Sequence, residues 1–336
     1  SLSIEDMIAE EEMVLTITHN GYIKRTSLST YRSQRRGGRG VQGASSREED
    51  FVEHLFIANT HSYILFFTDK GKCYWVKVYD IPEGGRAAKG RAIVNLIGCE
   101  PDEKVSAFIS VKEFNEDHYV VMATEKGMVK KTKLSAYSNP RKKGIYAVEI
   151  RDGDRLIEAR VSTGDNDILL GTRNGKSIRF SEEQIRASGR KTMGVKGITL
   201  SSEDDRLVGM LLIKREGTVL VATEKGFGKR TEISQYRAQK RGGKGVLTMK
   251  TNDKVGKMFT IKEVVDKDDL MIITNQGVLI RLPVAQIRSL GRATQGVKLI
   301  KLGEGTLVSS ITRIMSEEEE EDENNNTEST DPKAVS

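Results

Sequence analysis

The feature that most constrains the fold is a unit of about 50 residues that occurs six times along the chain. Each copy has an apolar run, a glycine turn and a basic pair or near-pair, as in "VLTITHNGYIKR" and "VLVATEKGFGKR". The turn glycines lie 50, 56, 48, 51 and 51 residues apart and are Gly21, Gly71, Gly127, Gly175, Gly226 and Gly277. A second glycine follows 19 residues later, or 17 in repeat three, at Gly40, Gly90, Gly144, Gly194, Gly245 and Gly296. This double spacing predicts six copies of one structural unit.

Each unit has the pattern of β-structure. Short apolar runs are broken by Asn-Gly, Lys-Gly or Gln-Gly, which favour hairpin turns. The best helical candidates are residues 4–12 and a single turn in "SEEQIRAS" (181–188). Since about 50 residues accommodate four strands, the sequence predicts an all-β, propeller-like ring of six four-stranded blades over residues 11–315. Closing the ring would remove exposed sheet edges.

One position of the repeat alternates between tyrosine and isoleucine. Ten residues after the turn glycines stand Tyr31, Ile81, Tyr137, Ile185, Tyr236 and Ile287. A tyrosine could stack on a nucleobase, but isoleucine offers no stacking face. The exchange therefore favours a core position.

The net charge of +6 conceals an uneven distribution. Residues 316–336 carry −8 and residues 1–15 carry −5, which leaves +19 on residues 16–315. A basic body between acidic ends suggests a polyanionic partner, although a solvated lysine-rich surface is the alternative. Two cysteines and four scattered histidines predict neither a disulfide framework nor a metal site. With no signal peptide or apolar span, we expect a cytoplasmic protein that has no membrane partner and no cofactor of its own.

The glycine-rich stretch "SQRRGGRGVQG" (33–43) contains the letters of a dinucleotide-binding turn, Gly38-x-Gly40-x-x-Gly43. That turn requires a hydrophobic strand before it and a helix after it, and neither context is present. "GTRNGKS" (171–177) resembles a phosphate-binding P-loop, but three residues instead of four separate its glycines. Both nucleotide sites are therefore excluded.

Every repeat places arginine or lysine among small residues just before its second glycine. Glycine amides and arginine forks suit phosphate, so six such loops predict a belt that contacts the backbone of a bent duplex without reading bases. The candidate DNA-binding residues are Gln34, Arg35, Arg36, Gly37, Gly38, Arg39, Gly40, Arg86, Lys89, Arg91, Arg141, Lys142, Lys143, Arg190, Lys191, Gln239, Lys240, Arg241, Gly242, Gly243, Lys244, Gly245 and Arg292.

A second basic series stands four residues after the turn glycines. Its members are Arg25, Lys131, Arg179, Arg230 and Arg281, with Trp75 interrupting the set in repeat two. It either extends the belt or forms an ordinary solvated strand face.

"QRRGGRG" (34–40) resembles the signature box of the carboxy-terminal domain of the DNA gyrase A subunit family. The six repeats, over residues 4–315, are similar to that family's β-pinwheel, whose blades exchange strands. The resemblance implies a non-catalytic domain that wraps double-stranded DNA and gives a type IIA topoisomerase its negative-supercoiling direction. It also implies that residues 34–40 form the essential DNA loop and help to join the first and last blades. "QKRGGKG" (239–245) satisfies the same box, so repeat five could share this role.

The same resemblance implies partners outside this chain. Residues 1–10 would link the domain to the catalytic region of the same polypeptide. An ATPase-bearing B subunit would complete an A2B2 complex near the nucleoid, and ATP and Mg would act through other domains.

The acidic stretch, residues 316–336, is predicted to be disordered and either aids solubility or competes with DNA for the basic rim. Two alternatives to a gyrase-type domain remain: the related topoisomerase IV A-type subunit, and a propeller scaffold that binds acidic proteins. An enzyme with its site in the ring channel has no clustered His, Cys or carboxylate residues in its favour.

Overall fold

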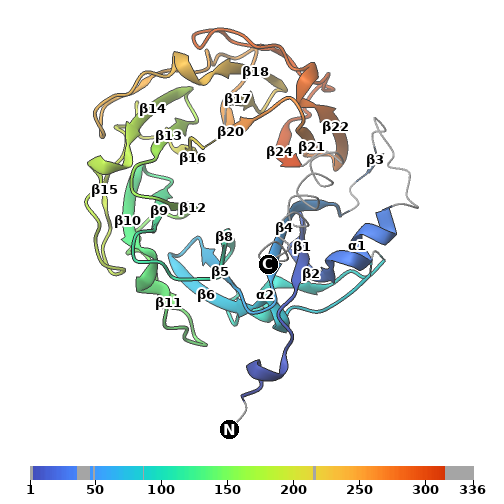
Figure 1. Ribbon diagram of the computed structural model, residues 1–336. Coiled ribbons are helices and arrows are strands. Elements are labelled where there is room, and N and C mark those ends of the chain that lie inside the picture. Colours follow the sequence, from blue (N-terminus) through green and yellow to red (C-terminus); the bar gives the residue numbers. More distant parts are fainter. Residues whose placement is uncertain (1–2, 36–45, 48–49, 86, 215–216, 315–336) are drawn as a thin grey trace, which may run out of the picture.

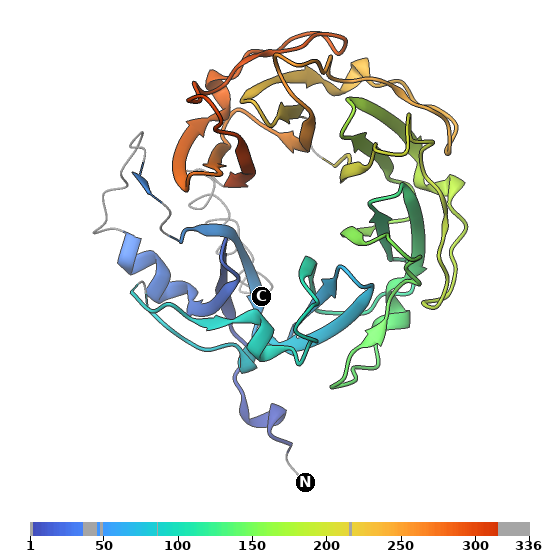
Figure 2. The same ribbon diagram turned by 180° about the vertical axis from the view of Figure 1, so that it is seen from behind.

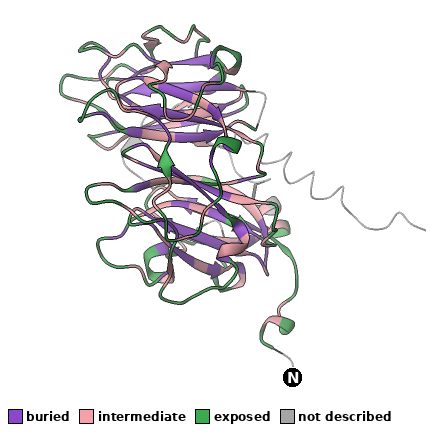
Figure 3. Cartoon of the chain, turned by 90° about the vertical axis from the view of Figure 1, so that its left-hand side faces the viewer, coloured by how far each residue is buried: buried purple, intermediate pink, exposed green. Residues whose placement is uncertain are grey.

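The computed structural model describes residues 3–35, 46–47, 50–85, 87–214 and 217–314. These residues form six four-stranded antiparallel sheets arranged as the blades of a ring (Figures 1 and 2). The predicted all-β, six-bladed architecture is confirmed. Figure 3 shows that buried residues concentrate in the strands, while the connecting loops are mostly exposed.

The blades, each given from its innermost to its outermost strand, have the following composition. Blade one contains β4 (Val52–Asn59), β1 (Glu12–Thr18), β2 (Tyr22–Ser27) and β7 (Arg91–Ala92). Blade two contains β8 (Val105–Val111), β5 (Tyr63–Thr68), β6 (Lys72–Lys77) and β11 (Ile145–Tyr146). Blade three contains β12 (Leu156–Ser162), β9 (Tyr119–Thr124), β10 (Met128–Lys133) and β15 (Val195–Lys196). Blade four contains β16 (Leu207–Leu212), β13 (Asp167–Thr172), β14 (Lys176–Ser181) and β19 (Val246–Leu247). Blade five contains β20 (Met258–Val264), β17 (Thr218–Thr223), β18 (Phe227–Glu232) and β23 (Val297–Lys298). Blade six contains β24 (Val308–Ile314), β21 (Asp269–Thr274), β22 (Val278–Pro283) and β3 (Ser46–Arg47).

Neighbouring blades exchange strands around the whole ring. Each repeat builds three strands of its own blade and supplies a two-residue outer strand to the blade before it. The first repeat supplies β3 to blade six, where Arg47 pairs with Val278 and Ser46 with Leu279. This exchange links the first and last blades, and residues 36–45 connect α1 (Leu28–Arg35) on the first repeat to β3.

The second glycine of the repeat is required where the exchange strand begins. Gly194 has φ +83°, and a Cβ there would lie 2.2 Å from the carbonyl oxygen of Val129 in the preceding blade. Gly245 has φ +76° and stands equally close, at 2.3 Å, to the carbonyl oxygen of Ser177. The regular spacing within the sequence thus reflects close packing of two backbones, in a conformation that other residues adopt at a cost.

The alternating Tyr/Ile position lies in the core between blades, as predicted. Tyr137 and Tyr236 are at most 1% exposed, and Ile81, Ile185 and Ile287 are also buried. Tyr31, which lies in α1, is half-buried. The apolar clusters span adjacent blades, so each blade completes the core of its neighbour.

The short helices follow the second strand of each repeat. They are α1, η2 (Val78–Asp80), η3 (Leu134–Tyr137), η4 (Glu182–Gln184), η5 (Ile233–Gln235) and η6 (Val284–Gln286), with the single-turn α2 (Ile93–Leu96) later in repeat two. The predicted turn in residues 181–188 is confirmed as η4. The eight-residue helix α1 was not expected: it places the backbone of Gln34 and Arg35, predicted to be loop, in a helix.

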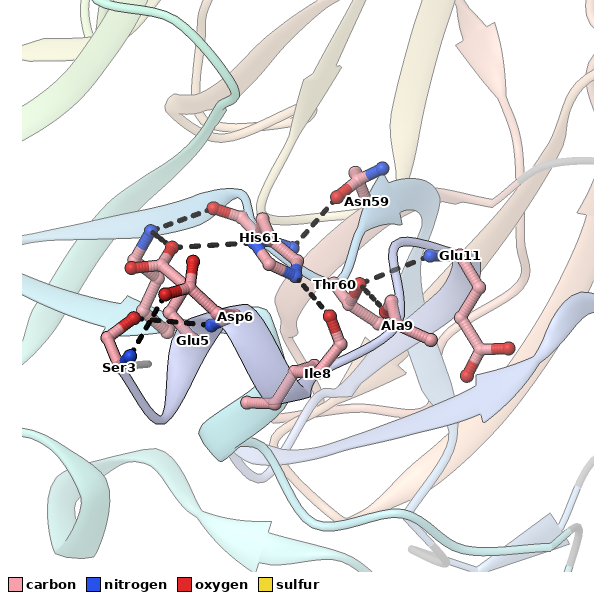
Figure 4. A network of polar contacts seen from close by, with 10 residues as sticks. Ser3, Glu5, Asp6, Ile8, Ala9, Glu11, Asn59, Thr60 and His61 are labelled. Carbon is pink, nitrogen blue, oxygen red and sulfur yellow. Dashed lines mark hydrogen bonds and ion pairs between the residues drawn. The ribbon is translucent and has the colours of Figure 1, made fainter. Parts of the chain in front are cut away.

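The helix expected over residues 4–12 is wrong. Only η1 (Glu5–Met7) is helical, and Glu12 already pairs with Asn59 as the first residue of β1. The chain before β1 instead lies against the turn after β4 (Figure 4). His61 contacts the carbonyl oxygen of Ile8 at 2.8 Å, and the Thr60 hydroxyl donates to the carbonyl of Ala9 at 2.7 Å. Glu5 accepts from the ammonium of Lys77 at 2.9 Å and so fixes this segment to the second blade.

Candidate nucleic-acid interface

The predicted DNA loops precede the exchange strands, which are the outermost strands of the blades. Eight of the candidate cations are exposed: Lys89, Arg91, Arg141, Lys142, Lys143, Lys191, Lys240 and Lys244. Arg36, Gly37, Gly38, Arg39, Gly40 and Arg86 lie outside the described residues, as do the side chains of Gln34 and Arg35.

In three loops, the arginine four residues before the second glycine forms a hydrogen bond to a backbone carbonyl of the neighbouring exchange strand. The guanidinium of Arg190 donates to the carbonyl of Tyr146 at 3.3 Å, and that of Arg241 donates to the carbonyl of Lys196 at 2.7 Å. Arg292 makes the same bond with the carbonyl of Leu247. Each acceptor ends the exchange strand supplied by the previous repeat. Part of each guanidinium is therefore engaged within the protein, which leaves its remaining N–H groups for an anion.

The amides of the glycine pair in repeat five are also engaged. Gly242 donates its N–H to the carbonyl of Gly197 at 2.9 Å, and Gly243 donates to the carbonyl of Lys240 at 3.4 Å. The interpretation of these two amides as free anion donors is wrong, because Gly242 bonds to the residue that follows the neighbouring exchange strand and Gly243 closes a turn within its own loop. Lys240 and Lys244 remain exposed on either side of the pair.

Neither interpretation of the second basic series is correct. Four of its five members, and Trp75 with them, donate to backbone carbonyls in or directly after the short helical turn of the following repeat. The bonds join Arg25 to Ile81 at 2.6 Å, Trp75 to Tyr137 at 2.9 Å, Lys131 to Glu182 at 3.1 Å, Arg179 to Tyr236 at 3.2 Å and Arg230 to Val284 at 3.4 Å. Trp75 fits the set because its indole N–H serves the same acceptor position. Arg281 instead pairs with Asp269 in its own blade, at 2.7 Å.

Three lysines that the sequence analysis missed lie beneath the loops of repeats two, four and six. Lys24 donates to the carbonyls of Gly85 and Ala88 at 2.8 and 2.9 Å. Lys130 and Lys229 are buried and likewise donate to loop carbonyls. Burial, with a nearby guanidinium, lowers the pKa of Lys130 to about 7 and that of Lys229 to about 8. Each of these lysines belongs to the preceding, odd-numbered repeat. The sequence indicates them by a lysine three residues after the turn glycine, which the even-numbered repeats lack.

Three exposed arginines at one position of the repeat were also missed. Arg186, Arg237 and Arg288 lie eleven residues after their turn glycines and are spaced 51 residues apart. That regular spacing could have identified them. They add a cation to each of three consecutive blades.

The described residues contain no group of three or more His, Cys, Asp or Glu side chains that could hold a metal ion. Within the same residues, no helix has the length and apolar character needed to cross a membrane.

The sequence matches a known family along its whole repeat region. The family described as "DNA gyrase C-terminal domain, beta-propeller" matches residues 12–59, 62–112, 118–163, 166–214, 217–264 and 268–314. The DNA gyrase A protein of Staphylococcus epidermidis is 47% identical over 319 residues, which cover 94% of this chain and 36% of the relative. This chain thus spans 36% of the length of that curated relative.

Two solved structures are similar to this one. The C-terminal domain of DNA topoisomerase IV has a TM-score of 0.84 and 26% identity, with 96% of this chain and 99% of that chain covered. The DNA gyrase A C-terminal domain has a TM-score of 0.69 and 24% identity, with 91% and 100% covered, and supports the fold alone.

Proposed function

This chain belongs to the family of DNA gyrase C-terminal β-propeller domains, and on that premise we propose that it binds duplex DNA along its outer loops and wraps it without sequence specificity. The domain performs no chemistry. It supplies the geometry that gives the strand passage of a longer type IIA topoisomerase its negative-supercoiling direction.

The observation that carries this proposal is the division of the cations into two populations. The basic series at the blade junctions is engaged with carbonyls, whereas lysines and arginines in the outer loops are exposed in successive blades. A curved row of cations matches the regularly spaced charges of a phosphate backbone. Contacts of this kind position DNA without reading its sequence.

Residues 34–40, which begin with the last two residues of α1, are the DNA-binding stretch that we expect to matter most. The exchange strand β3 follows them and pairs with blade six, so the stretch connects the two blades at which the ring closes. Residues 239–245, which carry the same pattern with exposed lysines, share in DNA binding. Replacing Arg35, Arg36 and Arg39 with alanine should weaken DNA binding while leaving the circular dichroism spectrum unchanged. An unaltered affinity would contradict the role of this loop.

The complete enzyme supplies what this chain does not. Residues 1–10 lead from the catalytic region of the same polypeptide, and an ATPase-bearing B subunit completes an A2B2 assembly. ATP and Mg act in those other parts, in the cytoplasm at the nucleoid.

The decisive test is ligation of nicked circular DNA in the presence of this chain, followed by separation of the topoisomers. A linking-number shift that grows with protein concentration is the expected result, and its sign gives the hand of the wrap. Tight binding with no shift would refute wrapping.

A second candidate is a topoisomerase IV-type domain, which would wrap DNA less tightly. The TM-score of 0.84 to such a domain favours it. The 47% identity to a gyrase A protein, against 26% to the topoisomerase IV domain, favours the gyrase type. In the same assay a weak wrapper would give a much smaller shift per bound protein.

A further inference from the structure

A pocket of about 490 Å³ lies beside the loop of repeat four that ends at Gly194. Its lining includes Arg186, Lys130 and residues 192–195. Arg186 is exposed, whereas Lys130 is only 1% exposed. The pocket therefore combines an accessible cation with one that is held in place inside the fold.

The loop beside this pocket turns its carbonyls toward the protein. The carbonyl of Arg190 accepts from Lys130 at 2.5 Å, and that of Thr192 accepts from the amide of Glu149 at 3.0 Å. By contrast, the amides of Lys191 and Met193 donate to no atom of the described residues. Backbone amides that lack an acceptor within the protein can donate to a bound anion.

The ammonium of Lys130 has a donor to spare. It has three N–H groups, of which the carbonyls of Ala147 and Arg190 take two, at 2.6 and 2.5 Å. Its lowered pKa, about 7, reflects burial and the positive charge of Arg190. An anion in the pocket would offset both effects and would favour the protonated lysine.

Repeat six shares part of this chemistry. Arg288 is exposed, but the ammonium of fully buried Lys229 has no donor to spare, because the carbonyls of Gly291, Arg292 and Thr294 take its three N–H groups at 2.9, 2.6 and 2.8 Å. The amides of Ala293 and Gln295 have no acceptor among the described residues.

Repeat five differs from its two neighbours. Ile178 stands beneath its loop in place of a lysine, and its glycine amides are engaged as described above. The loop of repeat five thus offers fewer amides to an anion and no lysine beneath it.

We propose that the pocket lined by Arg186, Lys130 and residues 192–195 binds one phosphodiester group of the DNA backbone, and that the equivalent loop of repeat six binds a second. This inference rests on the proposed function and assigns the amide-bound phosphates to repeats four and six. In repeat five, whose Gly242 and Gly243 amides are engaged, the exposed side chains of Lys240 and Lys244 supply the contacts.

The test is amide NMR of the full chain, labelled with 15N, titrated with a 12-base-pair duplex that is too short to wrap. Arg186→Ala is the main variant because its side chain is exposed and the fold does not depend on it. Lys130→Met removes only the buried cation beneath the loop of repeat four, so the loop of repeat six serves as an internal control. Fluorescence anisotropy on the same samples reports whether DNA binds at all.

We expect the duplex to move the amide resonances of Lys191 and Met193 along the binding isotherm. In Arg186→Ala these shifts should require about tenfold more DNA at low salt, while the shifts of Ala293 and Gln295 keep their midpoint. DNA binding without movement of these amides, or with equal movement in Arg186→Ala, would overturn the inference and leave the proposed function standing. Loss of all binding in the anisotropy measurement would refute both.

A parallel titration with inorganic phosphate distinguishes free anion from DNA backbone. The duplex should produce the shifts at a far lower phosphate concentration. Equal shifts at equal phosphate concentration would overturn the assignment to DNA.

Discussion

The two populations of cations predict separable effects on DNA binding and on stability. Replacing Arg186, Arg237 and Arg288 together with alanine removes three exposed charges from consecutive blades. Each lost phosphate contact should reduce the slope of log K against log salt by about 0.9, so the triple variant should lose up to about 2.7. Between 50 and 200 mM salt, the affinity gap between wild type and variant should then shrink by about 40-fold.

The matched control is Arg230→Met at a blade junction. Arg230 is 8% exposed and donates to Thr218 at 2.7 Å and to the carbonyl of Val284 at 3.4 Å. Losing these charge-assisted bonds should cost about 2 kcal/mol of unfolding free energy, since the pair with exposed Asp266 contributes little. The salt slope should stay as in the wild type.

Fluorescence anisotropy with a labelled duplex at four salt concentrations measures the slope, and thermal unfolding measures stability. The division of the cations into a DNA-binding and a structural population is refuted if the triple variant keeps the wild-type salt slope and the wild-type melting temperature. It is also refuted if Arg230→Met flattens the slope without lowering the melting temperature.

Three further outcomes are expected. Gly194→Ala should lower the melting temperature, because it forces alanine into a left-handed conformation that costs about 1–2 kcal/mol and brings its Cβ against the carbonyl of Val129. Gly189→Ala is the control, because its Cβ would stand in open space, and its melting temperature should equal that of the wild type. Equal melting temperatures for the two variants would contradict the packing role of the second glycine. Because the pKa of Lys130 falls to about 7 in the fold from about 10.4 in an unfolded chain, the unfolded state binds more protons between these values and stability from this group rises with pH. The difference in melting temperature between the wild type and Lys130→Met should therefore rise from pH 6.5 to pH 9.5. Lys133→Met, at an exposed lysine, is the comparison. A difference that stays constant with pH would refute the effect of burial on Lys130. Deleting residues 316–336 should tighten DNA binding, most at low salt; unchanged affinity would show that the tail does not compete for the rim.

Some features of the site could be predicted only in part. The loops of repeats two to six were located correctly among the described residues, because their glycines and cations recur in register. The helix α1 was missed because its sequence, "LSTYRSQR", lacks a regular apolar face and the other repeats have only a 3₁₀ turn at this place. The series that includes Arg25 and Arg179 looked like a surface charge pattern, since nothing in a single repeat shows which carbonyls lie opposite.

The sequence by itself determined the number of blades and the positions of the turns. These are local properties: a glycine with positive φ between two apolar runs makes a hairpin whatever surrounds it. Only the tertiary structure decided which cations face solvent. Arg179 meets the carbonyl of Tyr236, 57 residues away, and Lys229 meets that of Arg292, 63 residues away. Contacts across such separations exist only once neighbouring blades have exchanged strands and packed together.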